Sequence, residues 1–339
     1  MSFVVTVKPS NRQFTVEEGE TVLDAAIRHG LTFPYGCRNG VCGACRGKVV
    51  SGEISYPGGT PRALNELANI VGQSIFCKAA PCSDLMIEVH EIARSGELPI
   101  RKMPARVVKL ERLADDVMRV YLKLPDTERM QFLAGQYIDV LLPGGRRRSF
   151  SLANAPHEDM FLELHIRHID GGEFTGHVFN KMQEKDILRI EGPFGNFYLR
   201  EDSTRPIICV AGGTGFAPIK ALIEHAWREE IKRPVYLYWG ARAKEDLYLD
   251  ALPQSWRSHD GFYYIPVLSE PKPSDDAWTG RIGLVHQAVL DDFSDLAGYD
   301  VYVCGPPAMI EAARIGCENL GLPEDQFYFD SFDFAVDSL

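Results

Sequence analysis

Three cysteines lie close together early in the sequence and indicate metal chemistry. Cys37, Cys42 and Cys45 have the spacing C-x4-C-x2-C, and Cys77 follows further along the chain. This is the plant-type pattern in which four thiolates hold the two irons of a [2Fe-2S] cluster. Glycines between the cysteines allow the backbone to approach the sulfur atoms closely. A structural zinc site usually shows paired C-x2-C knuckles, whereas this loop has one, so the loop predicts a [2Fe-2S] cluster.

A basic segment in the middle of the chain, RRRSFS at 146–151, carries phosphate-binding and aromatic side chains. The guanidinium of Arg148 suits a phosphate group, whose oxygens it binds bidentately. Phe150 offers a flat aromatic face, and Ser151 offers a hydroxyl. Taken alone, the segment could equally be a basic strand with a solvated face.

A glycine turn, GGEFT at 171–175, stands before a helix-like stretch. The unpaired N–H groups at the start of a helix bind pyrophosphate, and Gly172 and Thr175 stand where such a helix would begin. An ordinary hairpin turn followed by a helix N-cap is an equally good interpretation of this segment by itself.

Two further loops follow apolar, strand-like runs. Residues 211–218, AGGTGFAP, lack the third glycine of the Rossmann fingerprint and end in Pro218. Their glycines still allow a dinucleotide to approach the backbone, and the following helix offers its N-terminus to phosphate. Residues 304–309, CGPPAM, would alone be a turn with one buried cysteine. No histidine lies near Cys304 in the sequence, so a cysteine–histidine nucleophile has no comparable support.

Composition limits the class of protein. With 339 residues, 45% hydrophobic and 24% charged, the chain is of ordinary globular composition and long enough for two or three domains. Its net charge of -11 argues against nucleic acid or an anionic membrane as the main partner. The first residues lack the basic start and apolar core of a secretion signal. We therefore expect a cytoplasmic protein that binds neither nucleic acid nor membrane.

The sequence divides into residues 1–93, a linker at 94–103, residues 104–203 and residues 204–339. The first segment has two strand-like runs, a helix-like run and the cysteine loop. The third has short strand-like runs separated by turn residues, which favours an antiparallel barrel. The last alternates apolar strands with helix-like segments, which indicates a parallel α/β domain. The strand-like runs are 3–7, 13–16, 105–108, 117–122, 137–142, 161–166, 207–210, 235–239 and 301–304.

These motifs together resemble the ferredoxin–NADP reductase superfamily, preceded by a plant-type ferredoxin domain. Arg148-x-Phe150-Ser151 is similar to its R-x-[YF]-S motif, 211–218 to its G-G-[ST]-G-x-[AG]-P loop, and 304–309 to its C-G-P-P-x-M loop. The resemblance covers essentially the whole chain. It extends to the reductases of bacterial oxygenases and, more closely, to the CDP-6-deoxy-Δ3,4-glucoseen reductases of dideoxysugar synthesis. The closer similarity rests on the runs 132–139, 211–218, 278–280 and 285–290.

The resemblance implies a multidomain α+β fold: a β-grasp ferredoxin domain, an antiparallel flavin-binding β-barrel and a parallel α/β nicotinamide-binding domain. It implies electron transfer from NADH to FAD, not FMN, then to the [2Fe-2S] cluster and an acceptor protein. That acceptor would be a sugar-nucleotide dehydrase or an oxygenase component. Ser151, near the flavin N5, and Cys304, beside the nicotinamide, are the implied catalytic residues. An iron–sulfur redox sensor is the alternative of another class, and it would need the cluster but not two nucleotide sites.

The implied site residues follow from the same resemblance. Cys77 stands where similar ferredoxin domains carry their fourth ligand, so it is preferred to Cys82. The implied cofactor-binding residues are Arg148, Phe150, Ser151, Gly172, Thr175, Gly212, Gly213, Thr214, Gly215, Arg242, Gly305 and Pro306.

Nucleotide choice and partner docking depend on charged residues. Arg242 and Lys244 could bind a 2′-phosphate, whereas Glu245 and Asp246 could bind free ribose hydroxyls, and the resemblance favours NADH.

For the partner, we expect a basic rim around the cluster to meet an acidic patch on the acceptor. The rim residues are Arg38, Arg46 and Lys48.

Overall fold

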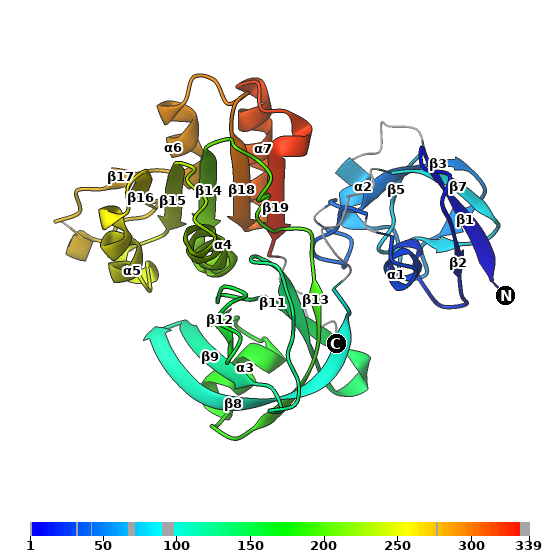
Figure 1. The fold of residues 1–339 in the computed structure, drawn as a ribbon, viewed down its shortest axis with the longest axis horizontal. Helices are drawn as coiled ribbons and strands as arrows, with labels where there is room; N and C mark the ends of the chain where they lie inside the picture. The colour runs from blue at the N-terminus through cyan, green and yellow to red at the C-terminus, as the bar shows by residue number, and fades with distance from the viewer. Residues whose placement is uncertain are drawn as a thin grey trace. The chain divides into compact units, whose positions relative to one another are not determined.

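The computed structural model describes residues 2–31, 33–41, 43–66, 72–89, 98–275 and 277–332. The chain divides into two compact units, Met1–Glu97 and Leu98–Leu339, and Figure 1 labels most of their helices and strands. No helix within these described ranges is long and apolar enough to cross a membrane.

The first unit is a small sheet with the strand order β2-β1-β7-β3-β5 and a helix, α1, that buries its apolar side. β1 pairs antiparallel with β2 and parallel with β7, as expected of a β-grasp domain. The Thr21 side chain begins α1 by accepting the N–H of Asp24 at 3.1 Å. The elements are β1 (Phe3–Lys8), β2 (Gln13–Val16), α1 (Val22–Arg28), β3 (Arg46–Ser51), β4 (Ile54–Ser55), α2 (Arg62–Glu66), β5 (Gln73–Ile75), β6 (Ala80–Pro81) and β7 (Leu85–Glu88).

The second unit starts with an antiparallel sheet of order β11-β10-β13-β8-β9-β12, with α3 beside it. Buried side chains alternate along β9 because one face of the sheet encloses the core. The elements are β8 (Arg101–Ala114), β9 (Val117–Lys123), β10 (Tyr137–Leu141), β11 (Arg147–Ser151), β12 (Leu162–Arg167), α3 (Glu173–Asn180) and β13 (Ile187–Phe194).

β8 begins inside the segment that was expected to be a linker. Arg101 pairs with Gly192, so 101–103 belong to the barrel, while 94–97 lie outside the described residues. Pro104, directly after the predicted linker, occupies a strand position opposite Arg189. The other predicted domain boundaries stay a prediction.

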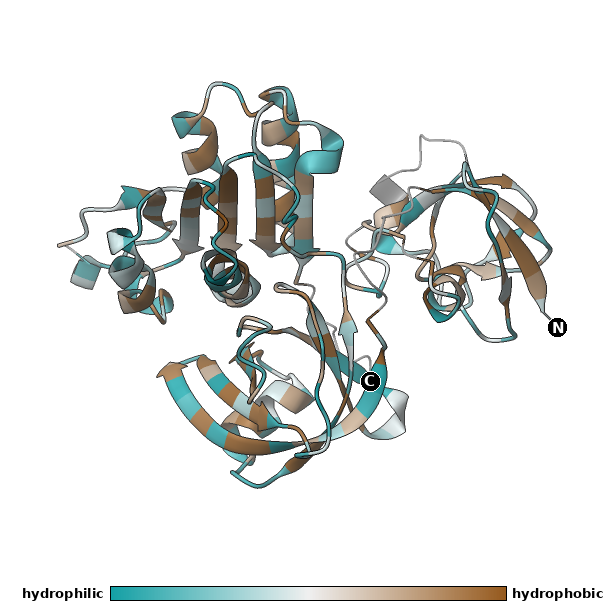
Figure 2. Ribbon diagram, in the orientation of Figure 1, coloured by the Kyte–Doolittle hydropathy of each residue, from teal (hydrophilic) through white to brown (hydrophobic). Residues whose placement is uncertain are grey.

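The rest of this unit is a parallel sheet of order β17-β16-β15-β14-β18-β19, covered on both faces by helices (Figure 1). Its central strands are hydrophobic along their length (Figure 2), as doubly covered strands must be. The strand order reverses between β14 and β18, and ligands bind at such a reversal, beyond the carboxyl ends of the strands. The elements are β14 (Ile207–Gly212), α4 (Phe216–Arg228), β15 (Val235–Ala241), α5 (Ala251–Ser255), β16 (Phe262–Leu268), β17 (Arg281–Ile282), α6 (Val285–Asp292), β18 (Asp300–Gly305), α7 (Pro307–Asn319) and β19 (Phe327–Ser331).

The barrel and the parallel sheet of this second unit share one hydrophobic core. Val117 and Phe197 from the barrel lie in the same buried cluster as Phe216 and Trp239 from the α/β part. Burial of apolar area holds the two parts together, so the ends of β11 and β12 lie against the loops at the reversal.

Candidate redox-cofactor sites

The cysteine loop contains several residues in left-handed backbone conformation. Arg38, Gly40 and Gly43 have φ angles of 54°, 88° and 70°. Successive N–H groups in such a chain can face one anion or sulfur site. Gly40 is also short of space, because a Cβ there would lie 3.0 Å from Lys78 Cγ and 3.1 Å from Pro61 Cβ. The loop is therefore held close to the segment that carries Cys77.

Cys45 and Cys77, both buried, lie side by side. The backbone N–H of Cys77 donates to Cys45 Sγ at 3.4 Å, an arrangement that suits a thiolate ligand. Cys37 is half-buried, Cys82 is exposed, and Cys42 lies outside the described residues. Among the described residues, which omit Cys42, no three His, Cys, Asp or Glu side chains are grouped as for a metal ion. The residues present fit a [2Fe-2S] cluster, and its four ligands stay a prediction.

The basic segment forms β11, whose alternate side chains fall on two faces. On one face, Ser149 Oγ donates to Asp139 Oδ1 at 2.7 Å, and Arg147 pairs with both Asp139 and Glu191. Asp139 is 2% exposed, and its charge is compensated by Arg147 on this face of the sheet. This face fastens β11 to β10 and β13.

The other face of β11 lies toward α3. The Phe150 ring packs against Phe174 with centroids 5.4 Å apart, and Arg146 forms an ion pair with Glu173. The pKa of Glu173 is lowered mainly by the hydrogen bond from Arg146 and, more weakly, by the nearby charge of Arg148. Because alternate side chains of a strand share a face, Arg148 lies on the same side of the chain as Arg146 and Phe150, the side toward α3. A guanidinium beside a helix start suits a pyrophosphate such as that of FAD.

The glycine turn before α3 is fixed by Thr175. Its Oγ1 accepts the N–H of Ile169 at 3.1 Å, and a Cβ on Gly172 would lie 2.6 Å from that oxygen. Because this hydroxyl already holds the turn, the predicted contact of Thr175 with the cofactor would use its backbone N–H.

Ser151 contacts a residue that the sequence motifs did not identify. Its Oγ donates to Asp330 Oδ2 at 3.2 Å, and both side chains are buried. Asp330 is the register partner of Cys304 in the sheet, so Asp330 is a neighbour of both predicted catalytic residues. Burial, reinforced by Asp330, raises the pKa of Cys304 well above its ordinary value. Cys304 is thus a neutral thiol, which disfavours a nucleophilic role.

The glycine loop lies against the CGPPAM loop. A Cβ on Gly215 would be 2.0 Å from Cys304 O, and one on Gly212 would be 2.9 Å from Pro306 Cδ. Thr214, between these glycines, is buried. Glycine is therefore required where the two loops touch, at the carboxyl ends of β14 and β18. Gly213, Gly305 and Pro306 lie in the same two loops, at the position where a dinucleotide binds in such sheets.

Arg167, at the end of β12, was also missed by the motifs. Its Nη2 is buried and has no hydrogen-bond acceptor among the described residues. Its Nη1 would lie 2.9 Å from a Cβ on Gly213. An unsatisfied guanidinium donor beside a glycine loop suits an anionic ligand, so the residues here fit a nicotinamide dinucleotide.

The comparisons with known families agree with this division. A model described as 2Fe-2S iron-sulfur cluster binding domain matches residues 5–82, one described as Oxidoreductase FAD-binding domain matches 104–198, and one described as Oxidoreductase NAD-binding domain matches 209–314. A redox sensor would not need the two nucleotide-binding domains.

Whole-chain relatives are similar from end to end. The CDP-6-deoxy-L-threo-D-glycero-4-hexulose-3-dehydrase reductase of Yersinia pestis is 38% identical over 98% of this chain and 99% of its own length. The reductase component 1 of terephthalate 1,2-dioxygenase from Comamonas sp is 36% identical over 98% of both chains. The crystal structure of an Amycolatopsis cytochrome P450 reductase matches with a TM-score of 0.82 and 34% identity, over 98% of this chain and 100% of the other. The chain therefore belongs to the family of iron–sulfur flavoprotein reductases, oxidoreductases that pass electrons from NADH through FAD to a [2Fe-2S] cluster.

Proposed function

We propose that the electrons leave this chain for a sugar-nucleotide dehydrase in the cytoplasm. The observation that carries the proposal is the full-length similarity to the Yersinia pestis dehydrase reductase, at 38% identity. An oxygenase component is the second candidate, because the terephthalate 1,2-dioxygenase reductase component is 36% identical over a similar length.

We assign the following roles to the residues of the nucleotide sites. The chemistry that FAD would supply here is acceptance of a hydride from NADH and release of single electrons. Arg148 and the start of α3 would hold the pyrophosphate, with Phe150 against the flavin. Ser151, oriented by Asp330, would place its hydroxyl at the flavin N5. Cys304, as a neutral thiol, would shape the nicotinamide site and exclude water.

The acceptor can be identified by direct assay. The reductase, with all cofactors loaded, is mixed with NADH and either a CDP-6-deoxy-hexulose dehydrase or the oxygenase component of a terephthalate-type system. We expect NADH-dependent turnover with the dehydrase and little with the oxygenase. The reverse pattern would assign the oxygenase component, not the dehydrase, as the acceptor. If NADH could not reduce even ferricyanide through the protein, the electron route itself would be overturned.

The structure modifies the expected docking rim. Arg38 is paired with Asp24 at 2.8 Å, and Lys48 lies opposite Glu88 in the sheet, so their charges are partly compensated. Lys78 follows Cys77, and its stem lies next to Gly40 in the cluster loop. We therefore expect Lys78→Glu to slow transfer to the acceptor roughly tenfold at low salt, with a smaller difference at high salt.

Lys48→Glu is the comparison variant: because Lys48 lies opposite Glu88, we expect its charge reversal to slow transfer less than Lys78→Glu does. The cluster spectrum checks that each variant is intact. Equal acceptor kinetics for Lys78→Glu and the unmodified protein, at both salt concentrations, would reject the docking model.

We predict a preference for NADH over NADPH, because Arg242, one of the two cations expected near the adenosine ribose, already has carboxylate partners. Arg242, at the end of β15, lies 3.3 Å from Asp246 and 3.9 Å from Asp116, and Lys272 pairs with Glu245. A 2′-phosphate would have to compete with these carboxylates. Comparison of kcat/KM for the two nucleotides tests the preference. We expect Asp246→Asn to decrease the ratio of kcat/KM for NADH to kcat/KM for NADPH. A higher kcat/KM for NADPH with the unmodified protein would show the prediction to be wrong.

A further inference from the structure

One face of β12 contacts the nucleotide-binding part of the second unit through three alternate side chains. Glu163, His165 and Arg167 alternate along the strand and so lie on one face, while Leu162, Leu164 and Ile166 lie in the barrel core. Glu163 reaches Lys220, His165 reaches Tyr248, and Arg167 lies against Gly213. This face thus connects the barrel to α4 and to the glycine loop.

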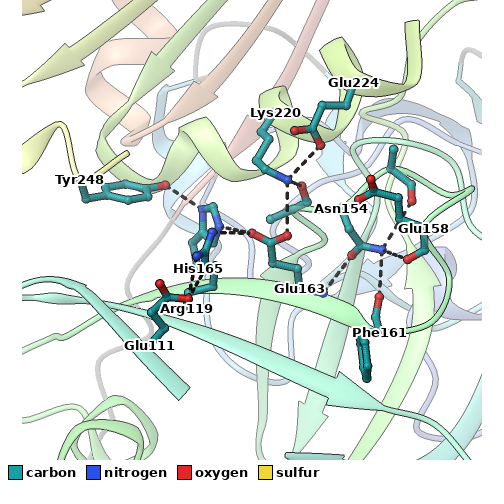
Figure 3. A network of polar contacts seen from close by, with 12 residues as sticks. Glu111, Arg119, Asn154, Glu158, Phe161, Glu163, His165, Lys220, Glu224 and Tyr248 are labelled. Atoms are coloured by element: carbon teal, nitrogen blue, oxygen red, sulfur yellow. Dashed lines mark hydrogen bonds and ion pairs between the residues drawn. The ribbon is translucent and has the colours of Figure 1, made fainter. Parts of the chain in front are cut away.

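Lys220 makes the first of these contacts, and Figure 3 shows it together with Glu163 and Glu224. It lies on α4, the helix that begins at Phe216 directly after the glycine loop, and it is 6% exposed. Its Nζ donates to Ala153 O at 3.0 Å and lies 3.4 Å from Glu163 Oε2 and 2.9 Å from Glu224 Oε2. Ala153 comes two residues after Ser151, so one ammonium group joins α4 to the flavin segment.

The charges at Lys220 are strongly constrained. Burial opposes the ammonium form of Lys220, but Glu163 and Glu224 raise its pKa overall. Burial also opposes ionisation of Glu163, yet the hydrogen bond with His165 and the charges of Lys220 and Arg119 lower its pKa to about 2. Burial raises the pKa of Glu224 to about 7. Although Glu224 has the shorter contact, we regard Glu163 as the main charge partner because it is ionised throughout the neutral range.

A second path runs from β12 to the glycine loop. His165 bonds Glu163 through Nε2 at 2.8 Å and Tyr248 through Nδ1 at 3.0 Å. Tyr248 packs edge-on against Trp239 at 5.2 Å, and Trp239 Nε1 donates to Gly213 O at 3.0 Å. The same strand face therefore restrains the glycine loop and the helix behind it.

We propose that Lys220, held by Glu163 and the Ala153 carbonyl, is a positioning residue that fixes the nicotinamide loop against the flavin segment for hydride transfer. The proposal rests on the assignment of these two segments as the nucleotide sites. A buried ion pair of this kind contributes little net stability compared with apolar packing, and it is better explained by the geometry that it specifies. Hydride transfer is sensitive to such geometry, since displacements of about 1 Å can cost 100-fold in rate.

The two carboxylates on Lys220 provide a matched pair of variants. Glu163 lies in the barrel, so Glu163→Gln weakens the charge contact between barrel and α4 while keeping the shape of the side chain. Glu224 lies four residues after Lys220 on the same helix, so Glu224→Gln leaves that contact in place. Lys220→Met removes the contacts with both carboxylates and with Ala153 O, and it serves as a second disrupting variant.

The test uses the full chain loaded with FAD and cluster, and rates are expressed per bound FAD. Flavin reduction by saturating NADH is followed by stopped flow, and we expect it to fall about 10- to 100-fold in Glu163→Gln and Lys220→Met. Glu224→Gln should remain close to the unmodified protein. Flavin reduction by dithionite, which needs no nicotinamide alignment, should be equal in all four proteins. The long-wavelength charge-transfer absorbance formed when NAD⁺ is added to the reduced protein should weaken only in the two disrupting variants.

The possible results distinguish failure of the positioning role from failure of the electron route. Unchanged NADH-driven reduction in both disrupting variants would overturn the positioning role and leave the route intact. Equal slowing in Glu224→Gln, or slow dithionite reduction, would also overturn it, because the effect would then be on the fold. If the unmodified, FAD-loaded protein were not reduced by NADH, the assigned nucleotide sites would fail instead.

Discussion

Replacing Cys77 by serine should remove the visible absorption and the reduced-state EPR signal of the [2Fe-2S] cluster, whereas NADH should still reduce ferricyanide. Cys77 is buried beside Cys45 and donates its N–H to that sulfur, so its thiolate is placed to complete the ligand set. The FAD- and NAD-binding domains lie in another part of the chain. Electron delivery to the acceptor protein should be abolished because the route from flavin to acceptor ends at the missing cluster.

The exposed Cys82 provides the control. Cys82→Ser should keep a full complement of iron and sulfide, and NADH-dependent delivery to the acceptor should be normal. Loss of the cluster in Cys82→Ser, with an intact cluster in Cys77→Ser, would reverse the ligand assignment. Loss of ferricyanide reduction in an FAD-loaded Cys77→Ser protein would contradict the modular route.

Gly215→Ala should almost abolish flavin reduction by NADH, with a loss of 100-fold or more. The added Cβ would lie 2.0 Å from the carbonyl oxygen of Cys304, and this neighbour is backbone that cannot rotate away. The glycine loop and the CGPPAM loop would have to separate at the point where the nicotinamide is expected. Dithionite should still reduce both the flavin and the cluster, because those sites do not need this contact.

Gly298→Ala, in the same domain, is the matched control, since a Cβ at Gly298 meets nothing within 4 Å. Stopped-flow reduction by NADH and the thermal midpoint are measured for both variants. Normal NADH reduction in Gly215→Ala would show that the close contact between the two loops is not required for hydride transfer.

The strands that were predicted correctly are those whose local pattern matches their burial. The run 117–122 alternates and became β9, and the apolar runs 207–210 and 235–239 became the central strands β14 and β15. β16 (Phe262–Leu268) was missed because Pro266 lies within it, and proline is normally excluded from central strands. β19 was missed as well, and with it Asp330.

The functional residues that escaped prediction depend on long-range packing. Ser151 and Asp330 are 179 positions apart, and Lys220 and Glu163 are 57 apart. No local motif connects such pairs, since they meet only after the barrel and the parallel sheet have packed together. The motifs themselves were informative because each needs its glycines, cysteines or arginine within a few residues of one another.

The alternation of β11 has a genetic consequence. Substitutions at Arg147 or Ser149 remove bonds to the buried Asp139. Such alleles would encode a less stable protein that loses function at elevated temperature, whether or not riboflavin is supplied. Substitutions at Arg148 or Phe150 would leave those bonds intact and, under the proposed assignment of these residues, would act mainly by weakening FAD binding. By mass action, a higher intracellular flavin concentration compensates for weaker binding, so such alleles would be remediable by riboflavin. The four consecutive codons 147–150 would therefore encode two kinds of mutant phenotype that alternate along a single strand.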